Sequence, residues 1–164
     1  MFTQRFIYLY AFLVCVGLMG TALTFQYVLH LEPCPLCILQ RVVVISLGLL
    51  FVLAALHNPG GTGRSIYGIL TAMLAVTGLG IAGWQVRLQH LPPDQVPECG
   101  PGLDYMLEVM PLKDILVKVF RGSGECAEVL WTFLGLSIPE WMLVVFSAFI
   151  LFGIYQIFFR PKAS

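Results

Sequence analysis

This sequence contains few charged residues. Only 11% of its 164 residues are charged, whereas 59% are hydrophobic, and the mean hydropathy is +0.88. Soluble domains carry roughly 25% charged residues, so this composition excludes an ordinary soluble protein. The sequence also lacks the clusters of lysine and arginine that bind phosphate backbones, so we expect no nucleic-acid partner. We therefore interpret the chain as a membrane protein that is embedded in the lipid bilayer.

Four segments are apolar for long enough to cross a bilayer, whose core needs about 20 helical residues. They run over about 6–29, 38–56, 66–86 and 141–159. The first is longer than the roughly 7 to 15 apolar residues of a secretory signal, and no clear A-x-A site follows it, so we expect a retained span. The predicted fold is an all-α membrane protein, with residues 1–164 forming a single domain. We expect a four-transmembrane-helix bundle with up-down connectivity.

Acidic residues are missing from three of the segments that flank these spans. These segments are the N-terminus, the turn at about 57–65 and the C-terminal tail, and their only charges are Arg5, Arg64, Arg160 and Lys162. By the positive-inside rule, both termini and the turn are cytoplasmic. The loops at about 30–37 and 87–140 then lie on the opposite side of the membrane.

Four of the five cysteines fall on that outer side, where disulfides form and persist. They are Cys34 and Cys37 at the start of the second span, and Cys99 and Cys126 in the long loop. The fifth, Cys15, lies within the first span, and we expect it to pack as a small apolar residue. We expect no metal site, because the outer thiols face an oxidising compartment and a second CxxC is absent.

Cys34 and Cys37 form a CPLC pair that favours redox chemistry over structural stapling, because a disulfide across two residues closes too short a loop to stabilise much. Pro35 suits the first turn of a helix, so we predict that the second helix begins within CPLC. A helix N-terminus would favour the thiolate form of these cysteines. Arg41 would share their helix face. It either stabilises an anion, such as a thiolate or a reduced acceptor, or extends to the lipid head groups.

The segments PCPLCILQR and SGECAEVLWTFLGLSIPEW, together with four spans and two outer cysteine pairs, resemble the DsbB family over nearly the whole chain. DsbB proteins are bacterial inner-membrane enzymes that generate disulfides. The resemblance implies a protein dithiol:quinone oxidoreductase with its redox loops in the periplasm. Such an enzyme reoxidises a DsbA-type periplasmic dithiol oxidase and passes two electrons to the membrane quinone pool, either ubiquinone or menaquinone.

The resemblance also implies roles for residues on the quinone side. Cys34 and Cys37 match the quinone-proximal pair, with Cys37 the thiolate expected at the quinone ring. Arg41 matches an arginine that supports quinone binding and reduction. His90 corresponds to a histidine near the quinone, although a histidine at this position equally suits a helix end in the head-group region. Gln40 stands where an acidic residue can occur in the family, a difference that can shift the redox potential or the quinone preference.

On the donor side, Cys99 matches the loop cysteine attacked by reduced DsbA, and Cys126 matches its disulfide partner. Cys99 lies in PPDQVPECGPG, whose prolines and glycines suit an exposed, open stretch. In the alternative interpretation, the two cysteines only staple the loop. Residues 103–120 have apolar residues near helical spacing, interrupted at Pro111, and we expect a short helix lying at the membrane surface.

A GxGxxG pattern at Gly78, Gly80 and Gly83 lies inside the third span, so we attribute it to close helix contact instead of nucleotide binding. Two other functions stay open at this stage. A vitamin K epoxide reductase-like enzyme also joins a membrane CxxC to a quinone-type ring, and a membrane scaffold with structural disulfides would need no chemistry at all.

Overall fold

The computed structural model describes residues 2–92, 95, 111, 124–129 and 131–158. Four long helices dominate this part of the chain: α1 (Phe2–Tyr27), α2 (Pro35–His57), α3 (Gly61–Gln89) and α7 (Ile138–Phe158). Each is long and apolar enough to cross a membrane, which confirms the expected all-α fold with four spans. Cys99 and, apart from Pro111, the expected surface helix at 103–120 lie outside the described residues.

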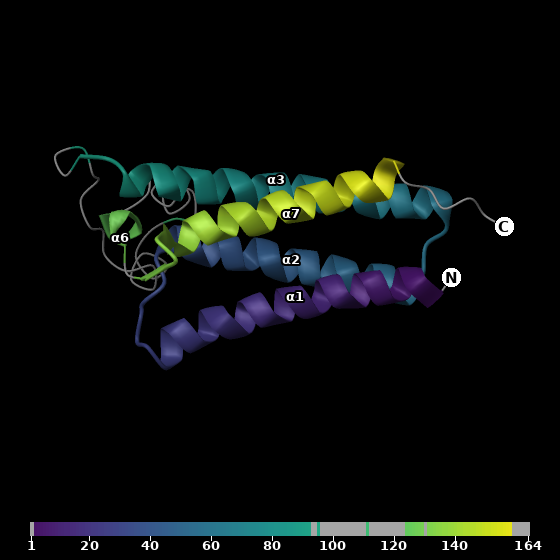
Figure 1. Ribbon diagram of the computed structural model, residues 1–164, viewed down its shortest axis with the longest axis horizontal. Helices are drawn as coiled ribbons and strands as arrows, with labels where there is room; N and C mark the ends of the chain where they lie inside the picture. Colours follow the sequence, from purple (N-terminus) through teal and green to yellow (C-terminus); the bar gives the residue numbers. More distant parts are fainter. Residues whose placement is uncertain (1, 93–94, 96–110, 112–123, 130, 159–164) are drawn as a thin grey trace.

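The four helices run side by side, and successive helices point in opposite directions (Figure 1). One end of the bundle holds the end of α1, the start of α2, the end of α3 and the start of α7, together with the short helix α6 (Gly124–Ala127). We call it the cysteine end, because Cys34, Cys37 and Cys126 all lie there. The opposite end holds the start of α1, the end of α7 and the tight link between α2 and α3. In that link Asn58 adopts a left-handed conformation, and its backbone N–H caps α2 by donating to the Ala54 carbonyl over 2.9 Å.

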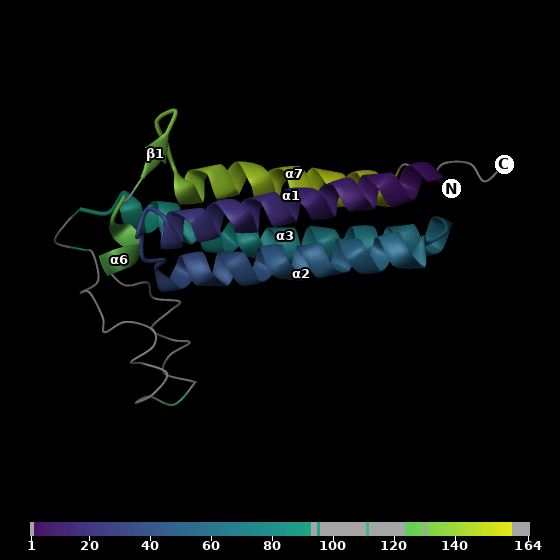
Figure 2. The same ribbon diagram turned by 90° about the horizontal axis from the view of Figure 1, so that it is seen from below.

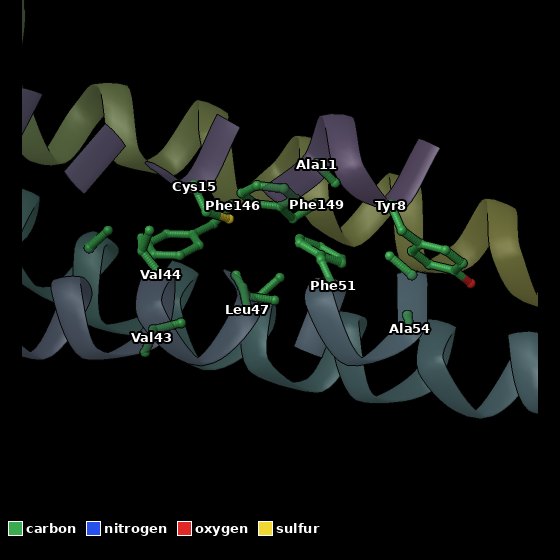
Figure 3. Close-up of a cluster of buried hydrophobic side chains, with 13 residues drawn as sticks. Tyr8, Ala11, Cys15, Val43, Val44, Leu47, Phe51, Ala54, Phe146 and Phe149 are labelled. Carbon is green, nitrogen blue, oxygen red and sulfur yellow. The ribbon is translucent and has the colours of Figure 1, made fainter. Parts of the chain in front are cut away.

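The centre of the bundle is filled by aromatic and aliphatic side chains (Figure 3). Leu47, Phe51 and Phe146 have at most 1% of their surface exposed. Cys15 belongs to the same cluster, with 3% exposed, as expected for a small apolar residue. Many large apolar side chains on the outer faces of the helices are exposed, which suits contact with lipid tails.

Helices α3 and α7 make the most extensive contact between helices in the described part of the chain. Glycines allow this close approach. A Cβ atom on Gly68 would lie 2.8 Å from the Gly153 carbonyl oxygen, and one on Gly78 would lie 2.5 Å from the Phe146 ring. Of the GxGxxG glycines, Gly78 thus fits the close-contact interpretation and Gly83 is in ordinary contact range of α7. Gly80 does not fit it, because nothing lies within 4 Å of its Cβ position.

A small hairpin precedes α7 and projects from the cysteine end (Figure 2). Its strands are β1 (Thr132–Phe133) and β2 (Leu136–Ser137), paired antiparallel with Phe133 opposite Leu136. Leu134 and Gly135 both have positive φ, at 53° and 82°, which is typical of a two-residue type I′ turn. We did not expect these strands from the sequence.

Ser137 ends the hairpin and caps α7. Its backbone N–H donates to Glu140 Oε2 over 2.6 Å, and its hydroxyl lies 2.9 Å from the same oxygen. Serine followed three residues later by glutamate is the capping-box pattern, which satisfies donors that a helix start leaves unpaired. The Ser137 hydroxyl also lies 2.9 Å from Gln89 Oε1, so this cap joins the start of α7 to the end of α3.

Candidate functional site

The CPLC pair forms the start of α2. Cys34 is the N-cap residue with an extended backbone, and Pro35 is the first helical residue. The backbone N–H of Cys37 donates to the Cys34 sulfur over 3.4 Å. These contacts confirm that the second helix begins within CPLC. The Cys34 sulfur accepts a hydrogen bond from one of the backbone N–H groups that a helix N-terminus otherwise leaves unpaired.

The two sulfur atoms of this pair are close enough to react with each other. Their Sγ atoms lie 2.8 Å apart, compared with about 2.04 Å in a disulfide. Cys34 is buried, whereas Cys37 is half-buried. The pair can therefore open and close with only a small movement of either side chain.

Cys126, on α6, lies beside the CPLC pair. Its side chain is fully buried and packs in one cluster with Cys34, Leu36 and Leu88, against which Cys37 also lies. The pKa of the Cys34 thiol is raised above its ordinary value. The largest cause is hydrogen bonding to Cys126, followed by hydrogen bonding to Cys37 and by burial. The structure thus brings three of the four predicted redox cysteines together.

Two buried glutamines complete the surroundings of the sulfurs. Gln85, on α3, places its Nε2 atom 3.3 Å from the Cys34 sulfur and 3.2 Å from the Cys37 sulfur. Its Oε1 atom accepts a hydrogen bond of 2.8 Å from Gln40 Nε2. No motif in the sequence points to Gln85 as a residue of the site. The available signal was a polar side chain within an apolar span, on a helix that ends beside CPLC.

Arg41 lies one turn after Cys37, and its side chain crosses to α1. It donates to Gln26 Oε1 over 2.5 Å and to the Ala22 carbonyl over 3.1 Å. Neither partner is an anion, and a guanidinium group has five N–H donors. The group is therefore held in position while its positive charge and further donors remain available to a ligand.

Arg41 and Cys37 line a common pocket of about 100 Å³ between α1, α2 and α7. Gln40 and Glu32 add polar groups, and the rest of the lining is predominantly apolar, including Leu18, Met19, Ala22, Phe25, Val44, Ile138 and Met142. This lining is typical of a site for a largely apolar small molecule that is oriented by a few polar contacts.

His90 is not among the residues that line this pocket. It forms the C-cap of α3, its side chain is exposed, and its Nδ1 atom lies 2.8 Å from the Val86 carbonyl oxygen. The structure therefore does not bring His90 into the group formed by Cys37 and Arg41.

A second, smaller hollow of about 30 Å³ lies on the α6 side of the sulfurs. Cys34, Cys37 and Gln85 line it together with Glu125 and Trp131, among others. Cys37 lines both spaces, so the CPLC pair lies between the loop that carries Cys126 and the larger pocket with Arg41.

The chain is similar to known proteins over most of its length. The family described as "Disulfide bond formation protein DsbB" matches residues 4–156. "Disulfide bond formation protein B" of Hahella chejuensis is 51% identical over 160 residues, covering 98% of this chain and 97% of that protein. The protein of the same name from Marinobacter nauticus is 51% identical over 93% of this chain and 91% of its own length. The one from Nitrosococcus oceani is 53% identical over 87% and 84%.

Proposed function

Because this chain belongs to the DsbB family, and is therefore a membrane oxidoreductase that generates disulfides and reoxidises DsbA, we propose a route for its electrons. In this route two electrons pass from a DsbA-type partner through the pair Cys99 and Cys126, then through Cys34 and Cys37, to a membrane quinone. The observation that carries the proposal is the position of the CPLC pair, which has Cys126 on one side and the Arg41 pocket on the other.

The same proposal assigns the compartments. Arg5 and Arg64 lie toward the end of the bundle opposite the cysteine end, and α7 also ends there, with Arg160 and Lys162 following it in the sequence. Positive residues favour the cytoplasmic side of a bacterial inner membrane. The cysteine end then faces the periplasm, where a soluble dithiol partner can reach it.

On the donor side, a thiolate of the reduced partner attacks the Cys99 sulfur and breaks the Cys99–Cys126 disulfide, which releases Cys126 as a thiolate. The partner's second thiol then displaces Cys99 and leaves the partner oxidised. Cys126 attacks the neighbouring sulfur of Cys34, which breaks the Cys34–Cys37 bond and releases Cys37 as a thiolate. Cys99 next attacks Cys126, restores the loop disulfide and leaves Cys34 reduced. Each exchange forms one S–S bond and breaks one.

On the acceptor side, the residues of the larger pocket fit a quinone head group. Its predominantly apolar lining suits a flat ring, and the Arg41 guanidinium supplies the N–H donors and positive charge that a ring oxygen requires as it gains electron density. A bound quinone supplies a two-electron, two-proton acceptor. Cys37 lies at the wall of the pocket, and Cys34 lies within reach to close the disulfide again.

The two other functions considered from the sequence receive less support. A scaffold needs no arginine in the lining of a pocket that a redox cysteine also lines. The vitamin K epoxide reductase-like interpretation shares the CxxC chemistry, but the relatives that cover nearly the whole chain are all named disulfide bond formation protein B.

The test is quinone reduction by the purified protein, followed by absorbance with a reduced DsbA-type protein as donor. We expect wild-type turnover, at least a hundredfold loss in Cys37→Ala because a reacting sulfur is removed, and about a tenfold or greater rise in the quinone KM in Arg41→Leu. Cys15→Ala is the matched control, because that cysteine packs in the core and lines neither of the two spaces beside the sulfurs, and it should keep wild-type turnover. Absence of turnover in the wild type with either ubiquinone or menaquinone would sink the proposal.

A further inference from the structure

The reacting sulfurs share one hydrogen-bonding neighbour that the proposed route does not use. We propose that Gln85 is a catalytic residue whose side-chain N–H groups stabilise the sulfur anion that appears when the CPLC disulfide opens, and that Gln40 is a positioning residue that sets the direction of the Gln85 amide. The inference rests on the proposed function, because that route releases a thiolate at Cys37.

The geometry singles out Gln85 because its Nε2 atom reaches both sulfurs. The distances are 3.3 Å to Cys34 and 3.2 Å to Cys37, although Gln85 lies on α3 and the cysteines lie at the start of α2. Only 3% of its surface is exposed. A buried amide loses its hydrogen bonds to water. While the Gln85 NH₂ group faces the two sulfurs, its side-chain oxygen therefore needs a hydrogen-bond donor from the protein.

Gln40 is that partner. Its Nε2 atom donates to Gln85 Oε1 over 2.8 Å, and Gln40 itself is only 4% exposed. A glutamine amide has one oxygen acceptor and one NH₂ donor, so occupying the oxygen on the Gln40 side turns the NH₂ group toward the sulfurs. The distances agree with this direction, because the Cys37 sulfur is 3.2 Å from Nε2 but 3.7 Å from Oε1.

An N–H donor in this position acts differently on the two redox states. A thiolate is a charged acceptor, whereas the sulfurs of a closed disulfide are neutral and accept weakly, so the hydrogen bonds strengthen when the pair is reduced. Burial strengthens them further, because water competes little for the sulfur. Gln85 therefore stabilises the reduced pair and makes the CPLC disulfide a stronger oxidant of the loop cysteines.

This role of Gln40 gives a physical reason why a glutamine at position 40 differs from an acidic residue there. A carboxylate at this position could only accept hydrogen bonds, so it would draw the NH₂ group of Gln85 away from the sulfurs. It would also bring a negative charge close to the developing thiolate. The glutamine at position 40 avoids both effects.

The test measures the CPLC pair alone. In the full-length chain carrying Cys99→Ala and Cys126→Ala, the oxidised fraction of the pair is followed in glutathione buffers of graded ratio. We expect Gln85→Leu to shift the equilibrium toward the disulfide by roughly tenfold or more, which corresponds to about 30 mV per tenfold change. Gln40→Glu should shift it in the same direction. Gln156→Leu is the matched control, because it removes another buried amide at the opposite end of the bundle, and it should leave the equilibrium unchanged.

An equilibrium constant for Gln85→Leu within about twofold of the parent chain would overturn the inference. If Gln85→Leu does not fold, Gln85→Glu replaces it, because a carboxylate keeps the size of the side chain and the acceptor for Gln40 but offers no N–H group to the sulfurs. That variant should show the same shift, and an unchanged equilibrium would be equally decisive against the role. The measurement uses neither quinone nor a partner protein, so failure of the proposed electron route leaves its outcome intact.

Discussion

Only two residues separate Cys34 from Cys37 in the CPLC motif, yet the surroundings of the two cysteines differ. Cys34 is buried, caps α2 and hydrogen-bonds with Cys126, which raises the pKa of its thiol. A group with a raised pKa keeps its proton as the pH rises through the usual cysteine range, and a protonated thiol is a poor nucleophile. Cys37 is half-buried and lines the larger pocket, so it is the more accessible sulfur of the pair.

This difference predicts selective alkylation. When the fully reduced protein is treated at about pH 8 with limiting iodoacetamide, Cys37 should be modified at least roughly tenfold faster than Cys34. Peptide mapping by mass spectrometry measures the two sites in one experiment. Denatured protein is the control, in which both thiols should react at similar rates. Faster modification of Cys34 than of Cys37 in the folded protein would contradict the conclusion that the Cys34 thiol stays protonated.

Some residues of the site could be predicted from the sequence and others could not. The spacing from Cys34 and Cys37 to Arg41 is local, so helical periodicity alone predicts a shared face. Most of α2, a turn and most of α3 separate Gln85 from the CPLC pair, and no spacing rule relates it to the sulfurs. Its role depends on how α2 and α3 pack, which only the three-dimensional structure specifies.

At the scale of helices, glycine decides how closely α3 and α7 approach. The Cβ position of Gly78 is 2.5 Å from the Phe146 ring, a distance at which atoms overlap, whereas that of Gly80 faces open space on the same helix. Phe146 is fully buried in the core, so it has little room to move away. The two glycines form a matched pair for testing helix contact.

We expect Gly78→Ala to destabilise the protein by about 1–3 kcal/mol, as overpacking of a tight core does. Gly80→Ala should be neutral or slightly stabilising, because alanine favours the helix and meets no neighbour. Thermal unfolding in detergent, followed by circular dichroism, measures both. Equal melting temperatures for the two variants would show that α3 and α7 do not pack as described.

The elements at the cysteine end were harder to predict than the spans. Long apolar runs have few alternatives to a membrane helix, so their existence follows from composition and length. The β1–β2 hairpin consists of two residues in each strand, too few for an alternating pattern to be recognised, and its turn places Leu134 in a conformation that usually requires glycine or asparagine. Tertiary contacts hold it, including the Trp141 indole that donates to the Phe133 carbonyl.

At the scale of the whole molecule, the bundle brings distant segments to one point. Helix α2 and its N-cap supply Cys34, Cys37 and Arg41, α3 supplies Gln85, and α6 supplies Cys126. The sequence alone predicts that these segments meet on the same side of the membrane, because the chain crosses the membrane twice between the start of α2 and the end of α3. It cannot predict that the Cys126 side chain packs against Cys34, since that contact depends on the path of the loop.

The contact between Cys126 and Cys34 is the central claim of the electron route, and trapping it tests that claim most directly. In the Cys37→Ala, Cys99→Ala chain, both residues lose their expected disulfide partners. Mild oxidation should then join Cys34 to Cys126 in most molecules, as mass spectrometry of an unreduced digest would detect. Adding Cys126→Ser should abolish the crosslink. Two unmodified thiols after oxidation of the folded chain, or crosslinks only between different molecules, would contradict the route.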